Sequence, residues 1–163
     1  AFLGCEFKKE VAAAKKTGAA LDQTSIRHLR HTRTMAKEPA KILFLDDSKD
    51  LRELMEAFLA SALGEKCRCF SNLMEFENHI EEVLRARVAI IDINLGPNVP
   101  GGIEAFQWLK DHGFQGKVLF FTGHARNNPQ VALAEQSGVE ILEKPLRPDK
   151  LISTVRCALR ETK

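Results

Sequence analysis

The stretch KILFLDDSKD, residues 41–50, places two adjacent carboxylates directly after a short apolar run. Residues 42–45 predict a strand that is buried on both faces, and Ser48 predicts the start of a helix. Asp46 and Asp47 carry like charges one residue apart, and Asp is a poor strand former. One explanation is local: Asp47 caps the following helix, a role for which Ser48 competes. The other is a ligand that makes the repulsion tolerable.

From residue 41 onward, strand-length apolar runs alternate with helical patterns. The clearest helix follows Ser48 and ends at Gly64, with apolar residues at i, i+3, i+4, i+7 and i+8 from Leu51. The predicted strands are 41–45, 67–70, 88–93, 117–122 and 139–142, and the other predicted helices are about 72–84, 102–112, 128–137 and 148–160. Strands and helices in strict alternation predict a parallel sheet that is covered on both faces.

In a sheet of this kind, ligands bind beyond the carboxyl ends of the strands. The side chains expected at those ends are Asp46 and Asp47, Asp92, Thr122 and Lys144. Three carboxylates, one hydroxyl and one ammonium group therefore converge on one crevice. A divalent cation would relieve the repulsion, and a set of hard oxygen ligands without His or Cys indicates Mg²⁺.

Over about residues 41–160, the chain resembles the receiver domain of two-component response regulators, the chemotaxis-regulator type. The double acid after the first strand, the 30 residues from Asp92 to Thr122 and the 52 residues from Asp92 to Lys144 are typical of that family. The resemblance implies a flavodoxin-like, doubly wound, five-stranded parallel sheet of order 2-1-3-4-5, with five helices on both faces. It also implies a cis peptide bond between Lys144 and Pro145.

The resemblance also implies roles for the acidic residues. Asp92 would accept a phosphoryl group from a histidine kinase. Asp47 and Asp92 would coordinate Mg²⁺ directly, together with the backbone carbonyl of Asn94, and Asp46 would act mostly through metal-bound water. Independently of the family, an Asp carboxylate is a nucleophile that is already ionised at neutral pH, so it needs no base.

Lys144 and Thr122 would contact the transferred phosphoryl group, and Thr122 would draw the following loop, residues 123–128, inward. His124 holds a position that, in the family, tunes loss of the phosphoryl group. The family often has Tyr or Phe three residues before the Lys, where this chain has Ile141. We therefore expect little change at Ile141 on activation. The loop after Asp92 is longer than usual, since Gly102 comes ten residues later where about eight are typical.

The composition is that of a globular domain, with 44% hydrophobic and 28% charged residues in a chain of 163. No apolar run approaches the roughly 20 residues that a membrane-spanning helix needs. The first residues do not resemble a signal peptide, and four cysteines are too few and too scattered for a disulfide scaffold. These features predict a cytoplasmic protein without a membrane span.

Residues 1–34 differ from the remainder of the chain. They carry seven Lys and Arg against three acids, a net charge of +4 in a chain of net charge +2. We predict a boundary near residues 35–40, with a basic extension or linker over 1–40 and the receiver domain over 41–163. The extension is either a functional segment, such as a docking helix or a basic patch, or a leader or non-native sequence upstream of Met35.

The function that these patterns predict is a single-domain response regulator that signals by phosphorylation-dependent protein binding. It would catalyse only its own phosphorylation and dephosphorylation, and it would lack a DNA-binding output domain. Its partners would be a sensor histidine kinase or a histidine phosphotransfer protein, and an unnamed target; a homodimer is kept among the alternatives. The competing predictions are a magnesium-dependent phosphohydrolase with an aspartyl nucleophile and a constitutive interaction domain with the receiver fold.

Overall fold

The computed structural model describes residues 39–123, 129–145 and 147–162. Strands and helices alternate along this part of the chain, with one exception between the second and third strands. The strands are β1 (Ile42–Leu45), β2 (Cys67–Phe70), β3 (Val88–Asp92), β4 (Lys117–Thr122) and β5 (Glu140–Glu143). The helices are α3 (Lys49–Leu63), α4 (Leu73–Asn78), α5 (Ile80–Val83), α6 (Gly102–Asp111), α7 (Pro129–Gln136) and α8 (Pro148–Glu161).

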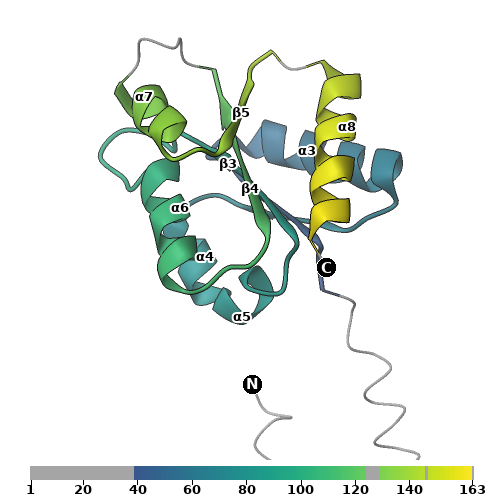
Figure 1. Ribbon diagram of the computed structural model, residues 1–163, viewed down its shortest axis with the longest axis horizontal. Helices are drawn as coiled ribbons and strands as arrows, with labels where there is room; N and C mark the ends of the chain where they lie inside the picture. The colour runs from purple at the N-terminus through teal and green to yellow at the C-terminus, as the bar shows by residue number, and fades with distance from the viewer. Residues whose placement is uncertain (1–38, 124–128, 146, 163) are drawn as a thin grey trace, which may run out of the picture. The chain divides into compact units, whose positions relative to one another are not determined.

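The five strands form one parallel sheet in the order β2-β1-β3-β4-β5, which confirms the predicted fold class. Helices α3 and α8 cover one face, and α4, α5, α6 and α7 lie on the other (Figure 1). None of the helices in the described ranges combines the length and the apolar composition that crossing a bilayer requires.

The helix predicted at 72–84 is interrupted, so the described ranges hold six helices rather than five. The break is at His79, whose backbone lies outside the helical region at φ −119° and ψ 29°. The His79 ring contacts the Glu75 carbonyl at 2.8 Å, and that carbonyl is the one that a continuous helix would offer to the His79 N–H. The His79 N–H instead donates to the Phe76 carbonyl, which closes α4 one turn early.

The two faces of the sheet bury separate apolar clusters, as the alternation of side chains along a strand requires. In β1, Leu43 and Leu45 face the helices α4 to α7, whereas Ile42 and Phe44 face α3 and α8. The same alternation runs through β3 and β4, whose central residues are almost fully buried. A strand that is covered on both faces has no polar positions, which is why these strands read as continuous apolar runs.

The start of α6 packs directly against the end of β3. A Cβ atom built on Gly102 would lie 2.1 Å from the Asp92 carbonyl oxygen, a distance that no real Cβ contact reaches. The Gly102 N–H donates to the Ile93 carbonyl at 2.9 Å, which fixes this approach. Glycine is therefore required at residue 102, because the helix starts against the backbone of the expected acceptor.

We predict that Gly102→Ala lowers the free energy of unfolding by about 1–3 kcal/mol, because the new methyl group must displace backbone rather than a flexible side chain. Gly123→Ala is the matched control, since its Cβ would lie at an ordinary 3.7 Å from the Lys144 side chain. Urea unfolding of both variants measures the difference. Equal stabilities of the two variants would show that α6 can move away from β3 without cost.

Candidate phosphoacceptor and metal site

Two buried carboxylates lie side by side at the carboxyl edge of the sheet. The register pairs Leu45 of β1 with Ile91 of β3, so the next residues, Asp46 and Asp92, end adjacent strands. Asp46 is 1% exposed and Asp92 is 6% exposed. Asp47 follows on the solvent side of the same strand end and is exposed. The parallel sheet thus brings together the three acids that the sequence predicted at strand ends.

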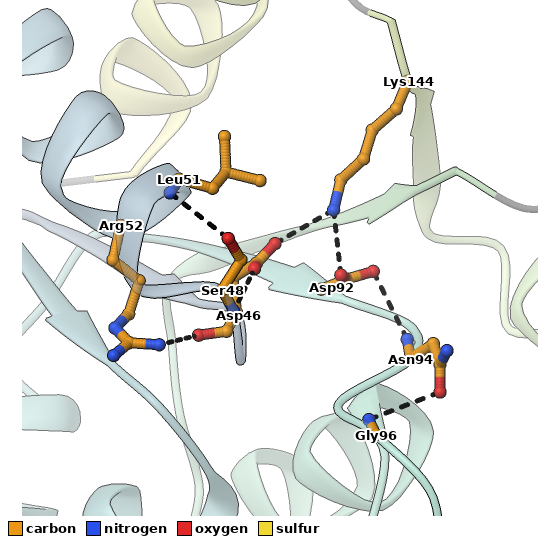
Figure 2. Close-up of polar contacts among 8 residues, drawn as sticks. All are labelled: Asp46, Ser48, Leu51, Arg52, Asp92, Asn94, Gly96 and Lys144. Atoms are coloured by element: carbon orange, nitrogen blue, oxygen red, sulfur yellow. Dashed lines mark hydrogen bonds and ion pairs between the residues drawn. The ribbon is translucent and has the colours of Figure 1, made fainter.

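Lys144 joins the two buried carboxylates. Its Nζ lies 2.9 Å from Asp46 Oδ2 and 2.8 Å from Asp92 Oδ2, and Figure 2 shows the side chain extending from the end of β5 toward both. The ammonium group also lies 4.5 Å from the centre of the Phe121 ring on β4, a favourable cation–π contact. The Lys144–Pro145 peptide bond is cis, as the resemblance implied.

Backbone N–H groups hold the remaining carboxylate oxygens. The Ser48 N–H donates to Asp46 Oδ1 at 2.9 Å, and the Asn94 N–H donates to Asp92 Oδ1 at 3.3 Å. The Asn94 side chain in turn accepts from the Gly96 N–H at 3.4 Å, which shapes the loop after β3 (Figure 2). Each buried acid therefore presents its carboxylate in a fixed orientation.

Ser48, and not Asp47, caps helix α3. The Ser48 hydroxyl accepts a hydrogen bond from the Leu51 N–H at 3.4 Å, and Ser48 has the extended backbone of an N-cap residue. The local explanation for Asp47 is therefore wrong. In the described part of the chain, the Asp47 carboxylate makes no hydrogen bond or ion pair. It is an exposed acid that the fold itself does not use.

The three acids fit a hard divalent cation. One carboxylate oxygen from each of Asp46, Asp47 and Asp92 can be chosen so that all lie within 4.8 Å of one another. The three acids and Lys144 sum to a formal charge of −2 when all are ionised, which a divalent cation would neutralise. The donors are all oxygens, the set that Mg²⁺ and Ca²⁺ prefer.

Burial controls the protonation of this cluster. Desolvation raises the pKa of Asp92 to about 6, and the neighbouring Asp46 charge adds to the increase, while Lys144 opposes it. For Lys144, burial alone would lower the pKa, but the hydrogen bonds to Asp92 and Asp46 outweigh that effect and the pKa is raised. Near pH 7, Asp92 is thus mostly ionised and Lys144 is charged.

Two other predicted site residues, Thr122 and Ile141, lie in β4 and β5. Thr122 ends β4 and is 1% exposed, and its carbonyl accepts a 2.6 Å hydrogen bond from the Lys144 N–H. Ile141 lies in β5 opposite Phe120 and packs against the cluster under α6 and α7. His124 and residues 124–128 of the predicted switch loop lie outside the described residues.

Sequence reasoning missed one residue that contacts this site. Arg52 of α3 donates from Nη1 to the Asp46 carbonyl oxygen at 2.6 Å (Figure 2). In the sequence, Arg52 is one of many charged residues on an amphipathic helix. Its position one turn after the Ser48 cap is the only signal that it could reach back to the strand end.

The sheet order, the strand-end acids and the facing lysine together define a two-component signalling domain. A sequence profile of the response regulator receiver domain matches residues 42–156, which is more than half of the chain. The chain belongs to this family. Receiver domains bind Mg²⁺ at an acidic pocket, and Asp46, Asp47 and Asp92 form an acidic cluster that could hold a metal ion.

Curated relatives are response regulators as well. The chain is 26% identical over 138 residues to the response regulator protein TodT of Pseudomonas putida, which covers 85% of this chain and 56% of TodT. It is 30% identical over 120 residues to the response regulator Rre1 of a Synechocystis strain, covering 73% of this chain and 51% of Rre1. The chain therefore spans about half the length of the curated relatives that it matches.

Solved structures agree with the fold. The receiver domain of NtrX from Brucella abortus superposes with a TM-score of 0.64 at 26% identity, covering 74% of this chain and 99% of that domain. A response regulator receiver protein from Pseudoalteromonas atlantica gives a TM-score of 0.65 at 24% identity, covering 75% of this chain and 98% of that chain, and shows the fold alone.

The raised pKa of Asp92 predicts how stability depends on pH. In metal-free protein, the folded state binds more protons than the unfolded state between an ordinary Asp pKa near 4 and the folded value of about 6. The free energy of unfolding therefore falls as pH rises through this window. Asp92→Asn removes the charge, and we expect it to stabilise the metal-free protein by about 2–3 kcal/mol at pH 7.5.

Near pH 4, where Asp92 of the folded parent is already protonated, Asp92→Asn should raise the free energy of unfolding by less than about 1 kcal/mol. Urea unfolding in the presence of a chelator at both pH values gives the comparison. Asp111→Asn, at an exposed position on α6, is the control and should show no such pH-dependent gain. A gain for Asp92→Asn that is equal at both pH values would contradict the raised pKa.

Proposed function

We propose that this receiver domain accepts a phosphoryl group on Asp92 from a phosphohistidine of a sensor kinase or phosphotransfer protein, and that it signals through phosphorylation-dependent protein binding. The observation that carries the proposal is the geometry of Asp92. It ends a central strand, is buried, and has one oxygen held by Lys144 and the other by a backbone N–H. Asp46 has the same two kinds of partner, but its side chain is only 1% exposed against 9% for Asp92, and Asp92 alone of the two ends the central strand of the sheet.

The chemistry needs little beyond this arrangement. The ionised Asp92 carboxylate attacks phosphorus, a P–O bond forms, and the P–N bond to the donor histidine breaks as that histidine leaves. Asp47, Asp92 and the Asn94 backbone carbonyl would hold a divalent cation directly, with Asp46 acting mostly through metal-bound water, and the cation would supply positive charge that offsets repulsion between the donor and the site. Lys144 orients the carboxylate and places a second positive charge beside the transferring oxygens.

Thr122 is the proposed responder to this event. It is buried at the end of β4, between the strand that ends in Asp92 and the strand that ends near Lys144, and this position supports a contact of its hydroxyl with a phosphoryl group on Asp92. Ile141 has no aromatic ring to rearrange and is β-branched, which restricts its χ1 angle. We therefore expect the conformational response in the segment after β4 and not at Ile141, with His124 as a residue that tunes loss of the phosphoryl group.

The alternative functions rest on fewer observations. Phosphohydrolases with an aspartyl nucleophile usually carry two acids as D-x-D on one strand, whereas here β3 ends in Asp92 and is followed by Ile93 and Asn94. A constitutive interaction domain would have no use for an exposed Asp47 beside a buried acid pair. A cytoplasmic location, a single-domain protein without a DNA-binding output domain, and residues 1–40 as a separate extension stay predictions.

An apolar groove beside Lys144 supports a protein donor. It has a volume of about 370 Å³ and runs between α3 and α8. Its lining is Leu51, Leu54, Met55, Phe58, Phe121, Lys144, Pro145, Pro148 and Leu151. Leu54 is 63% exposed on the rim, so it extends the apolar surface that a partner would contact. A helix of the donor protein that packs here would bring its phosphohistidine toward Asp92.

The direct test of the acceptor uses a small donor. Intact mass spectrometry after incubation with acetyl phosphate and Mg²⁺ should show one added phosphoryl group that mild base removes. Asp92→Asn should abolish the addition, whereas the control Asp111→Asn should be phosphorylated like the parent. An Asp92→Asn chain that still gains the mass would refute the assignment, and steady turnover of a generic phosphomonoester would favour the phosphohydrolase.

The test of the groove compares two donors. We predict that Leu54→Glu slows phosphotransfer from a histidine phosphotransfer protein by at least about 10-fold, because it puts a charge into an apolar contact. Phosphorylation by acetyl phosphate should stay the same, since that donor is too small to use the groove. Met74→Glu, at a residue that is 65% exposed on α4, is the control. If Leu54→Glu slowed phosphorylation by both donors equally, the substitution would be acting on the phosphorylation site and not on docking of the donor protein.

A further inference from the structure

The loop that joins β1 to α3 has only three residues, and it must present two adjacent acids in different directions. Asp46 points into the protein and Asp47 is exposed. Hydrogen bonds fix the side chains of Asp46 and Ser48, as described above. The Asp47 side chain has no such partner among the described residues. Its direction therefore depends on how the backbone of the loop is held.

Arg52 holds the backbone of this loop at the peptide group between the two acids. Its guanidinium donates at 2.6 Å to the Asp46 carbonyl, which belongs to the peptide group that joins Asp46 to Asp47 (Figure 2). On the other side, the Asp46 N–H donates to the Phe70 carbonyl of β2 at 3.2 Å. Hydrogen bonds in which one partner is charged are short and strong. The Asp46–Asp47 peptide is thus held by Arg52 of α3, and the preceding Leu45–Asp46 peptide is held by β2.

The Arg52 side chain is not engaged elsewhere. In the part of the chain that the structure describes, it forms no ion pair, and its charge contributes only a minor share to lowering the pKa of Glu75, which the Ser71 N–H dominates. The Arg52 backbone carbonyl accepts from Cys69 Sγ at 3.4 Å, which ties this turn of α3 to β2. Arg52 is therefore anchored through its backbone and directs its charge at the metal loop.

We infer that Arg52 is a positioning residue for the metal site: by holding the Asp46–Asp47 peptide, it sets the direction of the Asp47 carboxylate. The inference rests on the proposed magnesium binding. Two effects of Arg52 on a bound cation have opposite signs. The positive charge of Arg52 repels the cation, whereas the ordered Asp47 attracts it. Removing Arg52 therefore lowers the Mg²⁺ affinity if Arg52 positions Asp47, and raises it or leaves it unchanged if only the charge of Arg52 acts.

The test is Mg²⁺ titration of the folded chain, followed by calorimetry or amide chemical shifts. We expect Arg52→Met to weaken Mg²⁺ binding about 10-fold, at the lower end of the range for residues that orient metal ligands. Arg52→Lys keeps a charged donor and should recover part of the affinity. If positioning is wrong and the charge alone acts, Arg52→Met binds Mg²⁺ as tightly as the parent or more tightly.

Arg68→Met is the matched control. Arg68 also contributes to the low pKa of Glu75, but its guanidinium lies near Glu82, at 3.8 Å, and over the Phe70 ring, and it does not contact Asp46. Its loss should leave the Mg²⁺ affinity within about 2-fold of the parent. A drop equal to that of Arg52→Met would overturn the inference, because it would show a general effect of removing an arginine from this face.

Two further results distinguish failure of the metal site from failure of the role of Arg52. If the parent binds no Mg²⁺ while Asp47→Ala behaves like the parent, the metal site itself is wrong and the role of Arg52 falls with it. If the parent binds, Asp47→Ala does not, and Arg52→Met matches the parent, only the role of Arg52 is refuted. Should Arg52→Met fail to fold, Arg52→Gln, which also removes the charge, is the second variant and is expected to weaken binding in the same direction.

Discussion

The ion pairs of Lys144 with Asp46 and Asp92 are the interaction on which the rest of the site depends. They join β5 to β1 and β3, although β4 lies between. Strands in a sheet are about 4.8 Å apart, so the β3 and β5 backbones are separated by roughly 10 Å. Only a long side chain can span that distance, and Lys144 does so across the Phe121 ring of β4. The ion pairs therefore require the strand order, the length of the lysine side chain and the position of the Phe121 ring together.

Much of this arrangement could be predicted from the sequence because it follows from burial. A strand that is covered on both faces must be apolar along its whole length, so the runs at β1, β3 and β4 were located to within one residue. The parallel order then brings the strand ends to one edge, which places Asp46, Asp92 and Lys144 together without any information on their contacts. The fifth strand was predicted one residue early, at 139–142 rather than Glu140–Glu143, because a short edge strand carries exposed residues and a weak pattern.

Features that depend on one specific contact could not be predicted. At the break between α4 and α5, the His79 ring contacts the Glu75 carbonyl and the His79 N–H donates to the Phe76 carbonyl, and no periodicity signals these contacts. The contact of Arg52 with the Asp46 carbonyl depends on the entry angle of α3, which the Ser48 cap sets. The choice between Asp47 and Ser48 as the cap was open for the same reason, since both residue types suit the position.

Burial of Asp92, the proposed acceptor, has two opposing effects on the energy of its ionised form. It removes Asp92 from water, which raises its pKa to about 6 and makes the ionised form costly in the metal-free protein. It also lowers the local dielectric, so any positive charge brought beside Asp92 acts more strongly than it would at the surface. A cation that binds only the folded site with Asp92 ionised therefore offsets the free-energy cost of ionising Asp92, because its attraction to the buried carboxylate is strong. The charge cluster that makes the metal-free domain less stable is thus the same feature that, in the proposed function, would bind a cation and a phosphoryl group.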